Sequence, residues 1–399
     1  MNHHPCQPSS KHNRTMDRRR FVQSAAVAAT AGTIALPSWF SQAVAAEPAP
    51  NDASLAMPGP YPGRVIEVAY PGKVAKRDFK RESVDRMLAR GMTELTGADD
   101  GVSAWKSLFT RGDVVGVKVN PVGRPLAISN HVTVHAIVDA LKSAGVRAKD
   151  IIMFTRYESE ATPAGYPDHV PDGVRYETST QEYDPSQLDI KGYDPEVFCT
   201  MDFIEPSQHD PNDDRARRSH LCEIVSKKIN KMVTIPVLKD HGSGGITGAL
   251  KNMSHGFVNN VARSHSGHAG NTCNVFIPAV CAMRQIREKA TLHIMDGLVG
   301  VYQGGPFGPT KNYKFTWPYG ALFFGTDPVA MDRIEWQIID AKRAEMNLPP
   351  VAGSGKTAQD PLGTEGFDVR QPQHVNIAAG LGLGVADPEK IEHRKVKLT

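Results

Sequence analysis

The chain has 399 residues, of which 40% are hydrophobic and 22% are charged, and these values are ordinary for a globular protein. The formal net charge is +3, but residues 1–45 hold five basic residues and one acidic residue, so the rest of the chain is near −1. No long basic block remains there, which argues against a nucleic-acid-binding protein.

The first 45 residues have the features of an export signal. "MDRRRFVQS" begins at Met16 with a basic region, and the mildly apolar "AAVAATAGTIALPSWF" follows it. The small residues of Ala43–Ala45 suit a signal peptidase, and the apolar run is too short for a membrane span. Arg18 and Arg19 resemble the twin-arginine motif, which a translocase reads. We therefore expect residues 1–45 to be a signal peptide for periplasmic export, with a cytosolic basic tail as the alternative.

Residues 46–63 are rich in Pro, Ala and Gly and predict a linker. The segments that follow alternate in type: a strand at 64–70, a helix at 81–97, a strand at 113–120, a helix at 131–146 and a strand at 150–154. This order predicts one α/β domain over residues 64–399, with a mainly parallel central sheet and helices on both faces. Residues 156–220 lack clear periodicity and predict a long middle insertion with short strands, of the kind that often borders a site.

The segment "KMVTIPVLKDHGSGGITGALKNMSHGF" begins at Lys231 and predicts a site. Its apolar part, Met232–Leu238, predicts a central strand that ends in Lys239, Asp240 and His241. Ligands of parallel α/β sheets collect at the C-terminal ends of the strands. The glycines that follow allow a tight turn.

The helix predicted after this turn has two faces. Its apolar stripe consists of residues at helical spacing, namely Ile246, Leu250, Met253 and Phe257. Thr247, Lys251 and His255 form a polar ridge beside that stripe. Because the first turn of a helix favours anions, Thr247 together with Lys239 and Lys251 predicts an anion site. The alternative is an ordinary glycine turn and a solvated helix face, since the glycines match no phosphate-loop spacing.

A metal site is a second possibility. His265 and His268 lie in the loop "ARSHSGHAGN", and Asp296 ends the next predicted strand, which is followed by a Gly/Pro loop. We expect His241, His265 and Asp296 to approach one pocket as N and O ligands of a divalent ion, with His268 peripheral. A solvated loop is the alternative for the paired histidines.

Helices are further predicted at 274–289 and from Asp327-Pro328 onward, the latter after a strand. Cys199, Cys222, Cys273 and Cys281 remain after export and could pair or be buried as thiols. They show no C-x-x-C spacing, so no iron–sulfur cluster motif is present. The sequence also contains no serine nucleophile elbow and no H-E-x-x-H motif, which argues against a hydrolase.

Several motifs together resemble the bacterial and archaeal family called domain of unknown function 362. They are "KVN" at Lys118, "VLKDHGSGGITGALKNMSHG", "RSH", "IMDGLVGVYQGGPFG", "GTDPVAMDRI" and "AAGLGLGVADPEKIE". Relatives often carry an attached ferredoxin domain, and we expect this chain to be a member without it. The resemblance implies functional positions at Lys118, Asn120, Lys239, His241, Thr247, Lys251, Asn252, His265, Asp296, Asp327 and Asp332.

These observations together predict an exported enzyme, metal-dependent or redox-linked, that acts on a small anionic ligand. Lys239, Lys251 and His241 are the expected catalytic groups, and Lys118, Asn120, Thr247 and Asn252 the expected ligand contacts. The expected partners are the twin-arginine translocase, a small anion and a separate redox protein, with no nucleic acid and no stable membrane span. The alternative is a non-catalytic periplasmic protein that binds a ligand or a metal.

Overall fold

The computed structural model describes residues 53–70, 79–182, 184–265, 272–306, 313–353 and 372–399. All of them belong to the larger compact unit of the chain, Leu36–Thr399. The signal-peptide prediction, His268 and part of the Gly/Pro loop therefore lie outside the described residues. No helix within the described ranges is long and apolar enough to cross a membrane.

The centre of the domain is a mainly parallel sheet, as predicted. Its strands lie in the order β12-β1-β11-β10-β7-β2-β3-β4, and β11 is antiparallel to both of its neighbours. The bounds are β1 Arg64–Ala69, β2 Val115–Lys118, β3 Ile151–Tyr157, β4 Arg175–Thr180, β7 Lys231–Thr234, β10 Ala290–Val301, β11 Thr316–Gly325 and β12 Glu392–Lys397. A short hairpin, β8 Val237–His241 and β9 Gly245–Ile246, joins through β8 to β10.

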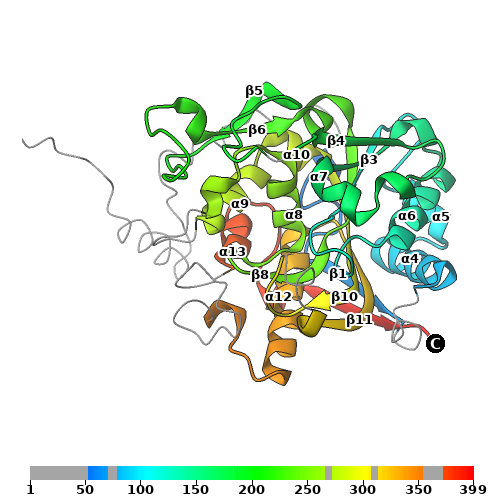
Figure 1. Cartoon of the computed structure of the whole chain (residues 1–399). Helices are drawn as coiled ribbons and strands as arrows, with labels where there is room; N and C mark the ends of the chain where they lie inside the picture. Colours follow the sequence, from blue (N-terminus) through cyan, green and yellow to red (C-terminus); the bar gives the residue numbers. More distant parts are fainter. Residues whose placement is uncertain (1–52, 71–78, 183, 266–271, 307–312, 354–371) are drawn as a thin grey trace, which may run out of the picture. The chain divides into compact units, whose positions relative to one another are not determined.

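Two groups of helices lie on opposite sides of this sheet (Figure 1). The first contains α4 Arg81–Thr96, α5 Gly101–Lys106 and α6 His131–Ser143. The second contains α8 Gly248–Phe257, α9 Cys273–Cys281, α12 Pro328–Glu345 and α13 Gln373–Gly380. Two short helices are also present, α7 Glu158–Ala161 and α10 Arg284–Lys289.

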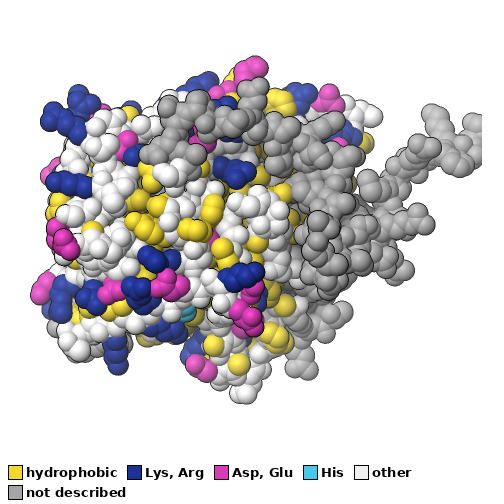
Figure 2. Space-filling model, turned by 180° about the vertical axis from the view of Figure 1, so that it is seen from behind, with side chains coloured by type: hydrophobic (Ala, Val, Ile, Leu, Met, Phe, Trp, Pro, Cys, Tyr) yellow, Lys and Arg dark blue, Asp and Glu magenta, His cyan; other side chains and the backbone are white. Residues whose placement is uncertain are grey.

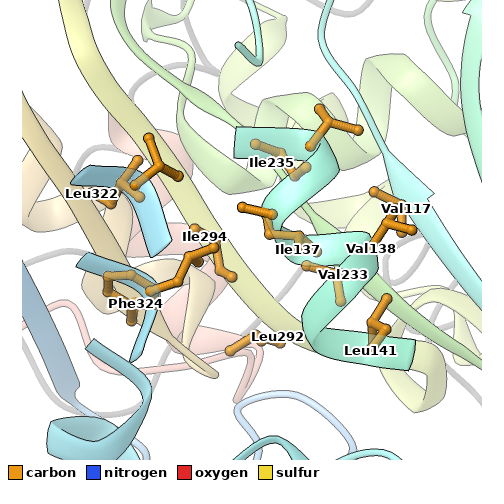
Figure 3. Packing of buried hydrophobic residues seen from close by; sticks show 14 of the residues in the cluster. Val117, Ile137, Val138, Leu141, Val233, Ile235, Leu292, Ile294, Leu322 and Phe324 are labelled. Atoms are coloured by element: carbon orange, nitrogen blue, oxygen red, sulfur yellow. The ribbon is translucent and has the colours of Figure 1, made fainter. Parts of the chain in front are cut away.

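The main hydrophobic core lies between the sheet and the first group of helices. Side chains of a strand alternate between the two faces, and every second strand residue belongs to this core. In β11, for example, Leu322 and Phe324 join it. Figure 3 shows Ile137, Val138 and Leu141 of α6 beside other strand residues of this core, such as Val117 and Val233.

The predicted strand Met232–Leu238 is interrupted in the structure. Pro236 lies between β7 and β8, and proline has no N–H to donate to a neighbouring strand. The chain therefore leaves the ladder with β2 after Thr234 and re-forms pairing with β10 at Val237. As a result, Lys239 and His241 lie in a second short strand, beyond the end of the central one.

Three other predicted boundaries differ from the structure. The helix predicted at 274–289 is divided into α9 and α10, which are separated at Ala282 and Met283. The predicted insertion contains β4, which pairs with β3 at the edge of the main sheet, and a separate pair of strands, β5 Tyr193–Thr200 and β6 Arg218–Cys222. In the predicted linker, Met57 is buried and its N–H donates to the Arg287 carbonyl oxygen.

Candidate functional site

A cavity of about 150 Å³ lies where β2, β3 and β8 end, against one side of α8. The predicted catalytic, ligand and metal residues all line it except Asp296, and the family positions Asp327 and Asp332 also lie outside its lining. We call it the lysine cavity, and its lining residues are Lys118, Asn120, Pro121, Val122, Thr155, Arg156, Glu160, Lys239, His241, Thr247, Lys251, Asn252, His255, Gly256, Val261, His265 and Pro306.

Lys118 is the last residue of β2, so its position follows directly from the sheet. Its Nζ donates to the Val119 carbonyl oxygen at 2.7 Å and lies 3.5 Å from Thr155 Oγ1. The side chain passes so close to α8 that a Cβ on Gly256 would lie 2.6 Å from Lys118 Cε. Glycine at position 256 therefore gives the lysine room beside the helix.

Lys239 is held at both ends. Its backbone N–H donates to Glu335 Oε1 at 2.8 Å, and its Nζ donates to Asn120 Oδ1 at 3.2 Å and to the Val122 carbonyl oxygen. The side chain is fully buried. Asn120 thus positions a second cavity lysine from the end of β2.

Lys251 and Asn252 come from adjacent positions of α8 and are both at most 6% exposed. Asn252 Nδ2 has no hydrogen-bond partner within the part of the chain that the structure describes. Buried polar groups normally have a partner. Because both residues also line the cavity, they are suited to receive a ligand oxygen.

The three lysines are costly to keep charged in this position. Burial lowers the pKa of Lys118 to about 7, that of Lys239 to about 7 and that of Lys251 to about 8. Desolvation is the main cause in each case, and the nearby Lys251 lowers the pKa of Lys239 further. A bound anion would offset this cost, because an opposite charge favours the ammonium form.

His241 is oriented by the glycine turn that follows it. Its Nδ1 accepts hydrogen bonds from the backbone N–H groups of Ser243 at 3.0 Å and Gly244 at 3.1 Å. A neutral imidazole that accepts at Nδ1 carries its proton on Nε2. This tautomer suits a hydrogen-bond donor to an anion, and it does not suit a metal ligand at Nε2, which would need that proton removed.

The turn itself is fixed to the Gly/Pro loop after β10. The N–H of Gly242 donates to the Gly305 carbonyl oxygen at 3.0 Å, and the N–H of Gly305 donates to Asp240 Oδ1 at 2.8 Å. These two bonds hold the His241 turn against the loop that brings Pro306 to the cavity.

The start of α8 does not offer the free N–H groups that were predicted to bind an anion. The Asp332 carboxylate of α12 accepts from the N–H of Ala249 at 2.5 Å and from that of Leu250 at 3.0 Å. Gly248 has φ +56°, and a Cβ there would lie 2.2 Å from Asp332 Oδ1. The protein's own carboxylate therefore occupies this helix terminus, and Thr247 is its N-cap residue, whose Oγ1 donates to the Asp240 carbonyl oxygen at 3.4 Å.

Asp296, like Asp332, accepts hydrogen bonds from backbone N–H groups. Its carboxylate accepts from the N–H of Asn130 at 2.9 Å, beside the start of α6, and from that of Leu298 at 3.1 Å. It lies outside the set of residues that line the cavity. The sequence predicted Asp296 at the end of a strand, but β10 continues to Val301, so Asp296 lies within the strand. The structure therefore does not bring Asp296 to the predicted metal site.

The predicted approach of His241 and His265 is present in the geometry. Their ring centroids are 5.6 Å apart, and His255 lies 5.1 Å from His265. The chain doubles back after α8 through the short helix Ala262–His265, which returns His265 to the cavity. His255 was predicted on the polar ridge, and it is the residue that lies beside His265.

The sequence reasoning missed three polar residues of the cavity lining: Thr155, Arg156 and Glu160. The first two lie at the end of β3, and β3 extends to Tyr157, whereas the prediction ended it at residue 154. The rule that ligands collect at the ends of parallel strands would have found Arg156 if the strand had been extended. Glu160 follows on α7 and is the acidic side chain of the lining.

The cavity differs from the outside of the molecule in charge. On the face shown in Figure 2, basic and acidic side chains lie next to one another. A separate surface hollow of about 590 Å³ is lined by exposed or half-exposed residues of the insertion: Asp184, Ser186, Leu188, Asp189, Ile190 and Arg215. The lysine cavity instead gathers buried positive charge, as a site for an anion would.

A family model described as "Domain of unknown function (DUF362)" matches residues 115–337, more than half of the chain. The chain belongs to this family. The DUF362 region begins at β2, just before Lys118, and ends in α12, just after Glu335, so it spans the residues that build and support the cavity. Asp327, another family position, accepts from the N–H groups of Gly63, Val329, Ala330 and Val385.

A crystal structure of a protein from Thermotoga maritima, solved by the Northeast Structural Genomics Consortium, is similar with a TM-score of 0.40 and 10% sequence identity. The match covers 67% of this chain and 59% of that chain, so the chain spans less than two thirds of the length of that protein. No match to a curated protein is found.

Proposed function

We propose that the protein is an enzyme that binds a small polyanion in the lysine cavity and transfers a proton to or from it. The observation that carries this proposal is the collection of Lys118, Lys239, Lys251 and Arg156 around about 150 Å³, against one acidic residue of the lining, Glu160. Pockets for drug-sized ligands hold about 300–1,000 Å³, so the ligand here is small. It carries at least two negative charges, as a phosphate or a short dicarboxylate does.

The side chains have different roles in this proposal. Lys251, Asn252 and the Nε2–H of His241 contact oxygens of the anion. Lys239, whose pKa of about 7 matches a neutral working pH, exchanges the proton with the ligand. Asn120 holds its Nζ in place through the 3.2 Å hydrogen bond.

Calorimetric titration of the full-length protein with inorganic phosphate, sulfate, oxalate and malonate tests the binding. We expect Lys251→Met to weaken binding about 10- to 100-fold, because a hydrogen bond to a charged group contributes about 1.5–3 kcal/mol. Lys142→Met on the surface of α6 is the matched control and should bind normally. Equal affinities for the two variants would refute the anion site.

Turnover separates the enzyme from a binding protein. Incubation with carboxylic acids in D₂O should place deuterium on the carbon next to the carboxylate, and Lys239→Met should abolish the incorporation. Binding without deuterium incorporation would favour the non-catalytic alternative. Reduction of a dye by the same compounds would favour the redox-linked alternative.

We further propose that the protein is exported by the twin-arginine route. The proposal rests on the order of basic residues, apolar run and small residues in the first 45 positions. Replacement of Arg18 and Arg19 by lysine should leave the uncut protein in the cytoplasm. Normal processing of that variant would show that the route is wrong.

A further inference from the structure

Three side chains with metal-binding atoms lie together behind one wall of the lysine cavity: His255, His265 and Cys273. One ligand atom from each lies within 4.8 Å of the others. They come from α8, from the short helix after it and from the first residue of α9, and α8 and α9 pack on each other. The two histidines also line the cavity.

Ser264 lies among these three residues and orients them. Its Oγ is 2.8 Å from His255 Nε2 and 3.0 Å from His265 Nδ1, and its carbonyl oxygen accepts from Cys273 Sγ at 3.2 Å. His265 Nδ1 also lies 3.3 Å from the Val261 carbonyl oxygen. A histidine that donates at Nδ1 to a backbone carbonyl keeps the lone pair of Nε2 for a metal, which is the usual arrangement around metal ligands.

We infer that His255, His265 and Cys273 form a site for zinc or a chemically similar divalent ion, with an open coordination position toward the lysine cavity. Two imidazole nitrogens and one thiolate are a donor set that zinc favours, and three protein ligands leave one position for water or a ligand. This site replaces the predicted set of His241, His265 and Asp296, of which only His265 remains.

Charge decides how tightly the ion binds. The thiolate of Cys273 offsets one positive charge of the ion, whereas the nearby Lys251 ammonium repels it. The two proposals thus make opposite predictions for one variant: Lys251→Met should weaken phosphate binding and strengthen metal binding. The metal inference itself does not depend on the proposed function.

Cobalt(II) is the probe, because a cobalt–thiolate bond gives a charge-transfer band in the near ultraviolet. Full-length protein that has been stripped with a chelator is titrated with CoCl₂ and then with ZnCl₂. We expect the band to saturate at one equivalent of cobalt and to disappear as zinc displaces it. Cys273→Ser should abolish the band. His265→Ala should weaken cobalt binding by more than about 100-fold, which is more than the loss of metal affinity that usually follows mutation of a residue that only hydrogen-bonds to a ligand.

Two controls keep the test decisive. Cys281→Ser removes another buried thiol, whose Sγ is hydrogen-bonded to the Leu250 carbonyl oxygen, and it should keep the band. His135→Ala removes a histidine of α6 and should leave cobalt affinity unchanged. Absence of the band in the wild type, or its persistence in folded Cys273→Ser, would overturn the inference. Titration of metal-free protein with phosphate tests the proposed anion site independently of this outcome.

Discussion

The buried acids and the buried bases of this protein have different surroundings. Asp296, Asp327 and Asp332 each accept two or more backbone N–H groups, which fix the ends of helices and the turns beside them. Lys239 and Lys251, by contrast, are buried side chains that line a cavity. The comparison teaches that the polar residues of the family motifs divide into residues that hold helix ends and turns and residues that line the cavity.

The largest expected effect is a loss of stability when one of the buried aspartates that hold helix ends is removed. Asp332→Ala should lower the free energy of unfolding by about 2–4 kcal/mol, because two buried N–H groups of α8 lose their acceptor at about 1–3 kcal/mol each. Urea denaturation measures this. Asp85→Ala removes an exposed ion pair with Arg81 and should cost less than about 1 kcal/mol. Equal losses would show that Asp332 does not hold the helix.

Removal of a cavity lysine should change the stability of the protein in the opposite direction. Lys251→Met keeps the length of the side chain and removes a charge that burial disfavours, as the lowering of the Lys251 pKa to about 8 indicates. Without anion, we expect the free energy of unfolding at pH 7 to increase by about 1–3 kcal/mol. The same denaturation experiment measures it. A clear loss of stability would show that Lys251, like the buried aspartates, stabilises the fold.

The pH dependence of stability sharpens the comparison further. The pKa of Lys118 and that of Lys239 are lowered by burial from 10.5 to about 7, so above pH 7 the unfolded chain binds more protons than the folded chain. Stability therefore rises with pH, by up to about 1.4 kcal/mol per pH unit for each lysine. We expect this rise in stability to continue to about pH 9. Burial raises the pKa of thiols such as Cys199, so above that pH the thiols ionise in the unfolded chain first, and this lowers stability as pH rises.

Guanidinium denaturation at half-unit steps from pH 7 to pH 9 measures this slope. Lys118→Met and Lys239→Met should each reduce it. The other charged groups that influence these lysines are Glu160, Arg156, Lys251, Glu335 and Cys222. A flat profile in the wild type would mean that both lysines keep ordinary pKa values in the folded state.

The smallest effect is expected at Gly256. Gly256→Ala places a Cβ 2.9 Å from Lys118 Nζ, and the flexible end of the lysine must move. We expect phosphate affinity to fall about threefold while stability changes little, since alanine favours the helix by about 1 kcal/mol. Gly101→Ala in α5, where a Cβ meets ordinary contacts, should leave affinity unchanged. Calorimetry of both variants decides whether the close approach matters.

The sequence predicted the sheet and most of the cavity because both follow from local patterns. Lys239 and Lys251 were found from a strand end and from helical spacing, which need no knowledge of distant contacts, whereas Lys118 came from the family resemblance. The role of Asp332 was beyond such reasoning, since it caps a helix that begins 84 residues earlier in the chain. Cys273 was also missed as a partner of His255, because its approach depends on how α9 packs against α8.

The capping of α8 by Asp332 has a consequence for synthesis. A ribosome makes the chain from its N-terminus, and Lys118, Lys239 and Lys251 all emerge before α12 exists. During that interval the first turn of α8 lacks the acceptor that later satisfies Ala249 and Leu250. The lysine cavity can therefore be completed only near the end of translation, and a nascent chain that stops before residue 332 should not retain the proposed anion.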